Sequence, residues 1–467
     1  MKRRVFLSAL MTGAAGALAP AIHAQERRAV RPVPRVRRGT QILVKGGAVL
    51  SLDPNVGDFD VADVLIDGAT IAAVGPNLSA RADAEVVDAS HAIVMPGFID
   101  THRHMWEGPL RNVLPNGLLS DYTRDITGAA RAIYRPEDAH TGDLVSGLGA
   151  INAGVTTVLD WSHIGNSPEH TDAAIAGLRE SGVRAVYAYG GGTPGPRNQF
   201  PRDITRLRRQ YFSSSDQLLT LAMAAATNVS DWAVARDVGA PITLHVNGAG
   251  ALLPLAASMK SDCTYIHCDN LTEEEWRLIA STGGHVSISG PIEMEMGHGV
   301  PPFQQALAHG IRPSLSVDVE TQMPGDLFTQ MRTAFTLQRM QVLARERAGE
   351  KNLPKLLTVR EVVEFATIEG AKANALDAKV GTLTPGKQAD IILLRHDRLN
   401  VLPLNNAYGA VVLDMDTSNV DTVFIAGAMV KSGGQLVGVD LNRVSRLAQQ
   451  SRDYILSKTG WPTSRVR

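Results

Sequence analysis

The sequence predicts an α/β fold: a (β/α)8 TIM barrel with a small β-sandwich domain that is built from both ends of the chain. Between residues 94 and 376, short apolar stretches alternate with stretches of helical periodicity, which is typical of parallel strands covered by helices. On either side, at 40–93 and 377–440, short strand-like segments are separated by glycine-containing turns, as in a β domain. A C-terminal helix is expected within residues 441–467.

Eight apolar stretches of the central region are expected to form the barrel strands, with helical stretches between them. The strands are predicted at 92–100, 156–161, 184–189, 218–224, 242–246, 264–268, 285–289 and 314–319. Helices are predicted at 171–180, 230–238, 273–280 and 302–309. In such a barrel the C-terminal ends of the strands meet at one face, and that face carries the active site.

The two flanking regions both consist of short strand-like segments, and they are expected to pair with each other. Near the beginning, strand-like pieces occur at 41–45, 48–50, 64–66 and 70–74, and near the end at 389–394 and 422–427. Glycine-containing turns punctuate both regions. The barrel is therefore predicted to be inserted between two halves of one β domain.

The first 24 residues have the pattern of a secretory signal peptide. A basic start precedes an apolar run at 5–19, and small residues offer cleavage after Ala21 or Ala24. The segment 3–7 (RRVFL) resembles a twin-arginine signal, so export by the twin-arginine machinery to the periplasm or beyond is expected. The apolar run is too short for a stable membrane span, and residues 25–39 are interpreted as a basic linker.

The composition fits a soluble enzyme that acts on a small molecule. The formal net charge is −1 at pH 7, which gives no support to nucleic-acid binding, and no later stretch has the length and apolar character of a membrane span. The only two cysteines, Cys263 and Cys268, flank an expected strand. An extended strand holds its ends too far apart for a disulfide, so both are expected to be free thiols.

Metal-binding residue types occur where the barrel strands end. His102 and His104 are two residues apart in an expected strand, so their imidazoles point to the same side. His245, His267 and Asp318 come near the ends of the fifth, sixth and eighth expected strands. Side chains at these positions converge at the active-site face, and imidazoles with a carboxylate are suitable ligands for Zn²⁺ or Fe²⁺.

This set of residues predicts a hydrolytic site. A divalent ion would lower the pKa of a coordinated water towards ~7, and Asp318 could accept its proton. His267 could hydrogen-bond the water or the oxygen on which charge develops. Four further side chains are candidates for substrate contact, because they follow the first, second and seventh expected strands: Trp106, His163, Glu293 and His298.

Three segments carry a resemblance to a known family. Residues 96–104 (PGFIDTHRH), 154–158 (GVTTV) and 380–390 (VGTLTPGKQAD) resemble the amidohydrolase superfamily, in particular its cytosine deaminase and triazine chlorohydrolase-like branch. The resemblance implies a barrel with one metal ion, Zn²⁺ in preference to Fe²⁺, and leaves a homo-oligomer open. It assigns the metal to His102, His104, His245 and Asp318, with His267 as a water or substrate contact.

The chain departs from this family pattern at two positions. Members with two metals carry a bridging lysine on the fourth strand, but residues 218–226 (LLTLAMAAA) contain no lysine, so a single metal is expected. Deaminases of this branch usually carry a glutamate three residues after the fifth-strand histidine, where this chain has Gly248. Glu293 and Glu295 are candidates to replace that acid.

The sequence therefore predicts a periplasmic or secreted amidohydrolase. Metal-activated water is expected to hydrolyse a non-peptide carbon–nitrogen bond of a small molecule, namely an amide, carbamate, urea or cyclic amide. One alternative is a hydrolytic deaminase or chlorohydrolase of a nitrogen heterocycle, of which dechlorination is less affected by the missing acid because chloride leaves without a proton. A second alternative is a non-catalytic binding protein on the same fold.

Overall fold

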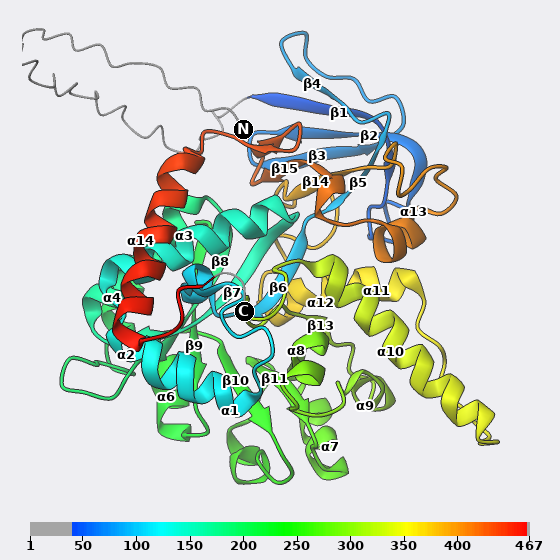
Figure 1. The fold of residues 1–467 in the computed structure, drawn as a ribbon. Coiled ribbons are helices and arrows are strands. Elements are labelled where there is room, and N and C mark those ends of the chain that lie inside the picture. Colours follow the sequence, from blue (N-terminus) through cyan, green and yellow to red (C-terminus); the bar gives the residue numbers. More distant parts are fainter. Residues whose placement is uncertain (1–39, 465–467) are drawn as a thin grey trace, which may run out of the picture. The chain divides into compact units, whose positions relative to one another are not determined.

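A computed structural model describes residues 40–464 (Figure 1). The predicted signal peptide (1–24) and the basic linker (25–39) lie outside the described residues, so both stay predictions. Among the described helices, none combines the length and apolar character needed to cross a membrane.

Eight parallel strands form the barrel sheet in the order β13-β12-β11-β10-β9-β8-β7-β6. Their bounds are β6 (Phe98–Arg103), β7 (Val155–Gly165), β8 (Arg184–Gly191), β9 (Leu219–Ala225), β10 (Ile242–Asn247), β11 (Cys263–Asp269), β12 (His285–Ile288) and β13 (Ser314–Leu315). A parallel bridge between Arg103 and Asp318 links the two outer edges beyond the last strand. The sheet is therefore nearly closed, and the predicted (β/α)8 barrel is confirmed.

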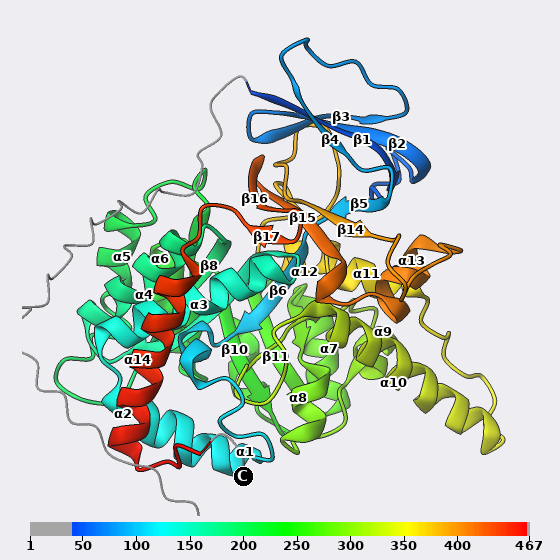
Figure 2. The same ribbon diagram turned by 45° about the horizontal axis from the view of Figure 1, so that its top comes forward.

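Helices surround this sheet, and α14 packs beside α3 (Figure 2). The α-helices are α1 (Leu119–Tyr122), α2 (Arg131–Ile133), α3 (Pro136–Asn152), α4 (Pro168–Ser181), α5 (Ile204–Gln210), α6 (Val229–Asp237), α7 (Glu273–Thr282), α8 (Gly290–Glu295), α9 (Phe303–Ala308), α10 (Leu327–Arg347), α11 (Val359–Phe365), α12 (Ile368–Ala373), α13 (Ala407–Gly409) and α14 (Leu441–Thr459). Short 3-10 or π turns are η1 (Met105–Leu110), η2 (Thr123–Ala130), η3 (Leu253–Ser258), η4 (Ala410–Asp414) and η5 (Thr417–Asn419).

Several of these helices begin at a side chain that caps the first turn. Asn228 accepts a hydrogen bond from the backbone of Ser230 at the start of α6, and Thr272 accepts one from Glu275 in a capping box at α7. Such side chains satisfy backbone N–H groups that have no partner within the helix. Local sequence therefore fixes where these helices start.

Strands from both ends of the chain form the β domain, as predicted. The path of the sheet is β17-β16-β15-β14-β5-β1-β2-β3, and β4 pairs with β1. Its strands are β1 (Gln41–Val49), β2 (Phe59–Asp67), β3 (Thr70–Gly75), β4 (Glu85–Asp88), β5 (Ala92–Pro96), β14 (Ile391–Arg395), β15 (Val420–Ile425), β16 (Ala428–Ser432) and β17 (Gln435–Leu436). The antiparallel pair β5–β14 joins the two ends.

Two predicted strands differ from the structure. The single strand predicted at 92–100 is divided into β5, in the β domain, and β6, in the barrel. The chain passes from one sheet to the other at Gly97, where a Cβ atom would lie 2.1 Å from a Thr156 methyl group, so only glycine fits. The eighth strand, predicted at 314–319, ends at Leu315, and Asp318 has a φ of 67°, which is incompatible with an extended strand.

Candidate metal centre

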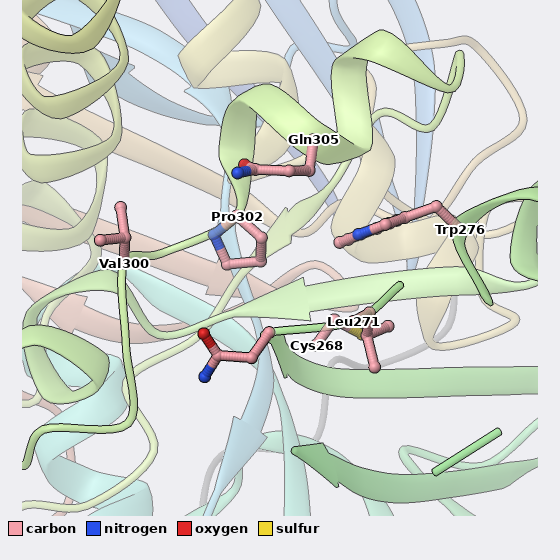
Figure 3. Close-up of a pocket in the computed structure, with 7 residues that line it drawn as sticks. Cys268, Leu271, Trp276, Val300, Pro302 and Gln305 are labelled. Atoms are coloured by element: carbon pink, nitrogen blue, oxygen red, sulfur yellow. The ribbon is translucent and has the colours of Figure 1, made fainter. Parts of the chain in front are cut away.

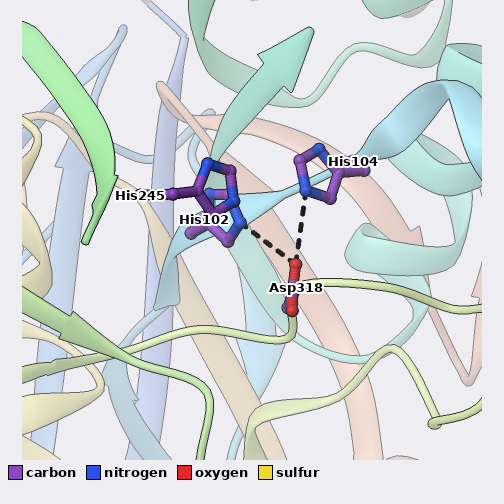
Figure 4. A group of neighbouring side chains, drawn as sticks. All are labelled: His102, His104, His245 and Asp318. Atoms are coloured by element: carbon purple, nitrogen blue, oxygen red, sulfur yellow. Dashed lines mark hydrogen bonds and ion pairs between the residues drawn. The ribbon is translucent and has the colours of Figure 1, made fainter. Parts of the chain in front are cut away.

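His102 and His104 lie at and just beyond the end of β6, and both face Asp318 (Figure 4). The Nε2 atom of His102 is 3.1 Å from Asp318 Oδ1, and the Nε2 atom of His104 is 3.4 Å from the same oxygen. Both imidazoles and the carboxylate are buried. The predicted pair of imidazoles therefore converges on one carboxylate oxygen.

His245, on β10, completes the group. Its ring centroid is 4.7 Å from that of His102 and 5.5 Å from that of His104. The potential ligand atoms of His102, His104, His245 and Asp318 all lie within 4.8 Å of one another. The structure thus brings together the four residues predicted as metal ligands, which we call the metal cluster.

The backbone around Asp318 holds this carboxylate against β6. The Asp318 N–H donates to the His102 carbonyl at 2.9 Å, and the His104 N–H donates to the Asp318 carbonyl at 2.9 Å. These bonds join chain segments more than 200 residues apart. The left-handed φ of Asp318 turns the chain directly after the eighth strand, so the position of the carboxylate is fixed by the closing edge of the barrel.

The chemistry of the donor set fits a divalent metal ion. Burial lowers the pKa of His104 to about 3 and also lowers the pKa values of His102 and His245. Neutral imidazoles and a carboxylate are the protonation states in which these side chains bind metals. The Nδ1 atom of His104 lies 2.9 Å from the Trp161 carbonyl, and donation there leaves Nε2 free as a ligand.

His267, at the end of β11, approaches the metal cluster from a further strand. Its Nε2 atom is 3.9 Å from Asp318 Oδ2, and its Nδ1 atom is 3.1 Å from Glu293 Oε1. Glu293 also accepts the Ser289 N–H at 2.8 Å. Glu293, predicted as a substrate contact, is thus placed as the hydrogen-bond partner that orients His267.

His163 lies beside the metal cluster, and Trp106 contacts His163. The His163 ring is 4.2 Å from the His104 ring, centroid to centroid. The indole N–H of Trp106 donates to His163 Nδ1 at 3.0 Å, and the Trp106 side chain is fully buried. Trp106 therefore supports His163, because its only polar atom is engaged there.

Sequence reasoning missed Trp161, which lies on β7 two residues before His163. Its ring centroid is 4.3 Å from that of His245, and its indole nitrogen has no hydrogen-bond partner among the described residues. Two residues along a strand return a side chain to the same face. The spacing from His163 is the signal that could have identified Trp161 as a wall of the site.

His298 and Asp269 form a second group next to His267. The rings of His298 and His267 are 4.7 Å apart, and His298 Nδ1 is 4.0 Å from Asp269 Oδ2. Asp269 was not among the sequence candidates, although it ends the sixth strand two residues after His267. Glu295, the other acid considered, ends α8 and is half-buried.

A cavity outside the metal cluster lies between α7 and α9 (Figure 3). Seven residues line it: Cys268, Asn270, Leu271, Trp276, Val300, Pro302 and Gln305. None of these belongs to the metal cluster. Cys268 lines this cavity and is not part of the metal cluster, and burial raises the pKa of its thiol.

Comparison with known proteins identifies the family. Residues 93–430 match the amidohydrolase family. Among curated relatives, a 5'-deoxyadenosine deaminase of Methanosarcina barkeri is 24% identical over 444 residues, covering 89% of this chain and 99% of the relative. A 5-methylthioadenosine/S-adenosylhomocysteine deaminase of Syntrophus aciditrophicus is 25% identical over 447 residues, covering 88% and 98%.

Solved structures show the same fold. An adenosine deaminase from Xanthomonas campestris with bound zinc superposes with a TM-score of 0.76 at 21% identity, covering 90% of this chain and 99% of that one. An atrazine chlorohydrolase from Arthrobacter aurescens complexed with zinc gives 0.76 at 22% identity, covering 88% and 100%. The family match spans most of the chain, so the chain belongs to the amidohydrolase family and is a metal-dependent hydrolase of carbon–nitrogen bonds, as predicted.

Proposed function

We propose that this member of the amidohydrolase family hydrolyses a carbon–nitrogen bond in a small nitrogen heterocycle, with a cyclic amide as the first candidate substrate. The observation that carries the proposal is the position of the Asp318 carboxylate, with one oxygen 3.1 Å from His102 Nε2 and the other 3.9 Å from His267 Nε2. A single carboxylate thus touches the metal cluster and also faces a hydrogen-bonding imidazole.

Four side chains would hold one divalent ion: His102, His104, His245 and Asp318. Zinc is the ion we propose, because the donor set suits it and two structures of the same fold contain zinc. When bound, such an ion would lower the pKa of a coordinated water towards ~7 and polarise the substrate carbonyl.

Different residues of the chain then carry out proton transfer and substrate orientation. Asp318 accepts a proton from the attacking water, because its Oδ2 atom points away from His102 and towards His267. His267 directs Nε2 towards the substrate oxygen, while Glu293 fixes the ring through Nδ1. Trp161 and His163 close the side of the site next to His104 and His245.

A second candidate function is removal of an amino or chloro substituent from a heterocycle. The names of the relatives favour it, since they are deaminases of adenine nucleosides and a chlorohydrolase of atrazine. Loss of chloride needs no proton donor, whereas loss of ammonia does. The presence of Gly248 at the position of the usual glutamate therefore argues against deamination more than against dechlorination.

Mass spectrometry of products distinguishes the two candidates. Zinc-loaded protein would be incubated with cyclic amides, ureas and carbamates and with amino- and chloro-substituted triazines and purines. Ring opening or two fragments from a carbonyl substrate supports the first candidate. A hydroxylated ring that has lost ammonia or chloride supports the second. His102→Ala protein is the control, and product formation by this variant would contradict both candidates.

We also propose that the protein acts after export to the periplasm. The support is the N-terminal pattern alone: two arginines before an apolar run and the small residues Ala21 and Ala24. Replacing Arg3 and Arg4 with lysine should leave the precursor in the cytoplasm, measured by cell fractionation and immunoblotting. Normal periplasmic accumulation of the double variant would overturn the twin-arginine assignment.

A further inference from the structure

Asp269 and His298 are buried polar side chains without hydrogen-bond partners among the described residues. The Asp269 side chain is 0% exposed and that of His298 is 4% exposed. Neither carboxylate oxygen of Asp269 and neither ring nitrogen of His298 has a partner. Buried polar groups are normally satisfied, so this Asp269–His298 pair is arranged to interact with something that enters the site.

The pair lies next to the position at which the expected glutamate is missing. Asp269 ends β11, and its carbonyl accepts the N–H of Gly248 at 2.9 Å. Gly248 has a φ of +89°, a conformation that a glutamate adopts only with strain. The chain therefore has no carboxylate at the end of β10, but it has one on the neighbouring strand, beside the same backbone position.

Two other buried carboxyl groups near the metal cluster are already engaged. Glu293 accepts from His267 and from the Ser289 backbone, and Glu107 accepts from the Tyr122 hydroxyl at 2.6 Å. By comparison, both oxygens of Asp269 are available. Among these three, Asp269 is the acid whose carboxyl group is not held in place by a hydrogen bond within the described residues, so it is free to turn towards His298.

The protonation states suit proton donation at neutral pH. Burial, reinforced by the charge of Glu293 and opposed by that of His267, raises the pKa of Asp269 to about 7. Burial lowers the pKa of His298 to about 4. The available proton therefore resides on Asp269, while His298 is a neutral imidazole that can relay it. Glu293, His267 and His298 are the titratable groups that face Asp269.

We propose that the Asp269–His298 pair delivers the proton that the leaving nitrogen needs, in place of a carboxyl group at position 248. The Asp269 carboxylic acid gives its proton to His298 Nδ1, across the present 4.0 Å after a small side-chain rotation. His298 simultaneously gives its Nε2 proton to the nitrogen as the carbon–nitrogen bond breaks. Asp269 becomes a carboxylate, and His298 is left with its proton on Nδ1. The proton that Asp318 took from water then reaches His298 Nε2 through solvent, and the Nδ1 proton returns to Asp269, which restores both groups.

This inference rests on the proposed function, because it concerns the leaving group of that reaction. His298 is the residue that touches the substrate, and Asp269 acts through it. A proton donor matters for a poor leaving group such as ammonia or an alkylamine and not for chloride. The dependence of rate on the leaving group is therefore the property that separates proton delivery from a structural role.

The test uses the zinc-loaded full-length protein with paired substrates that differ only in the leaving group, amino or alkylamino against chloro. Asp269→Asn and His298→Gln should lower kcat for the nitrogen leaving group about 10²–10⁴-fold, the usual contribution of general acid catalysis. Turnover of the chloro compound should change less than threefold. Two matched controls should behave as wild type: Asp262→Asn, at the opposite end of β11, and His309→Gln, a half-buried histidine that follows α9 and lies outside the metal cluster.

The wild-type protein provides a second measurement that needs no folded variant. Turnover of the amino substrate should fall as pH rises above about 7 and Asp269 ionises, whereas turnover of the chloro substrate should not fall there. Equal falls for both substrates, or equal losses in both variants, would overturn proton delivery. A drop from two bound metal ions to one in Asp269→Asn would also overturn it and assign the pair to a second metal site. If the wild type opens cyclic amides but converts neither compound, the two variants are compared on the cyclic amide, whose ring nitrogen needs the same proton, and unchanged ring opening would overturn proton delivery. If it converts none of these compounds, the proposed function itself fails.

Discussion

Asp318 and Asp160 are both withdrawn from solvent, with 4% and 0% of their surfaces exposed, but their pKa values are shifted in opposite directions. Burial by itself would raise the pKa of Asp318, and the hydrogen bond and charge of His102 with the nearby His267 and His104 lower it instead. Burial raises the pKa of Asp160 to about 7, against smaller opposing effects of hydrogen bonds.

The neighbours of Asp160 explain this difference. Asp160, on β7, faces Asp143 from α3, and burial with the repulsion from Asp160 raises the pKa of Asp143 as well. The Asp143 side chain is hydrogen-bonded to that of Asp160, and two carboxyl groups can form such a bond only if one of them carries a proton. Equal burial thus yields a charged ligand where imidazoles converge and a protonated scaffold pair where carboxyl groups meet.

Removal of the metal should have the largest effect on turnover, because it acts on the metal cluster that contains the charged Asp318. Dialysis against a chelator should abolish turnover, because the imidazoles and Asp318 alone leave water unactivated. Added Zn²⁺ should restore turnover and raise the melting temperature, since ligand binding stabilises the folded state. Activity and thermal denaturation of apo and reloaded protein measure both effects. Full activity with less than one-tenth equivalent of metal would contradict the assignment.

Asp318→Asn should have the next largest effect. The amide keeps the shape of the side chain but cannot accept the proton of the attacking water, so turnover should fall at least about 10²–10⁴-fold. Metal content by elemental analysis separates loss of the base from loss of the ion. Asp143→Asn, which changes an equally buried carboxyl group outside the metal cluster, is the matched control and should retain turnover. A folded, metal-containing Asn variant with normal turnover would rule out the base role.

Glu293→Gln should have a moderate effect, because Glu293 acts through His267. The Glu293–His267 hydrogen bond of 3.1 Å fixes which nitrogen of His267 faces Asp318. Loss of such an outer-shell partner typically costs about 10–100-fold in activity or metal affinity. Comparing the change in kcat with the change in KM identifies the cause of the loss, since a disoriented His267 lowers kcat more than it raises KM. Glu295→Gln is the control, and an equal loss there would contradict this role.

The metal cluster could be predicted from the sequence because strand ends mark it. Apolar runs located the strands, and the period of two placed His102 and His104 on one side. Trp161 could have been found in the same way from its spacing to His163, but the Glu293–His267 bond and the Asp269–His298 pair could not. Both of these depend on contacts between neighbouring strands or loops, and one sequence does not show which loop folds over which strand end.

The barrel could likewise be predicted from its apolar strands, but the prediction of the β domain missed several strands. Long apolar stretches identified the barrel, whereas β4, β16 and β17 were not predicted because they are only four, five and two residues long. The split between β5 and β6 depends on the close approach of Gly97 to Thr156. That approach is a tertiary contact. Pro96-Gly97 marks a turn-prone point in the sequence, but it does not show that the chain passes from one sheet to another there.

The smallest expected effect concerns the protonated Asp143–Asp160 pair, which should make stability depend on pH. Since the folded-state pKa values of Asp143 and Asp160 are raised above 3.8, their contribution to stability is complete below the unfolded value. It is lost as pH rises through about 7. The wild-type melting temperature should therefore fall by a few degrees as pH rises from about 4 to about 7, since ~1 kcal/mol corresponds to ~2–4 °C in mid-sized domains. Asp143→Asn removes the shared proton and should reduce this fall, whereas Asp262→Asn, at an ion pair with Arg236, should retain it. Parallel curves for all three proteins would mean that the Asp143–Asp160 pair does not control the loss of stability over this pH range.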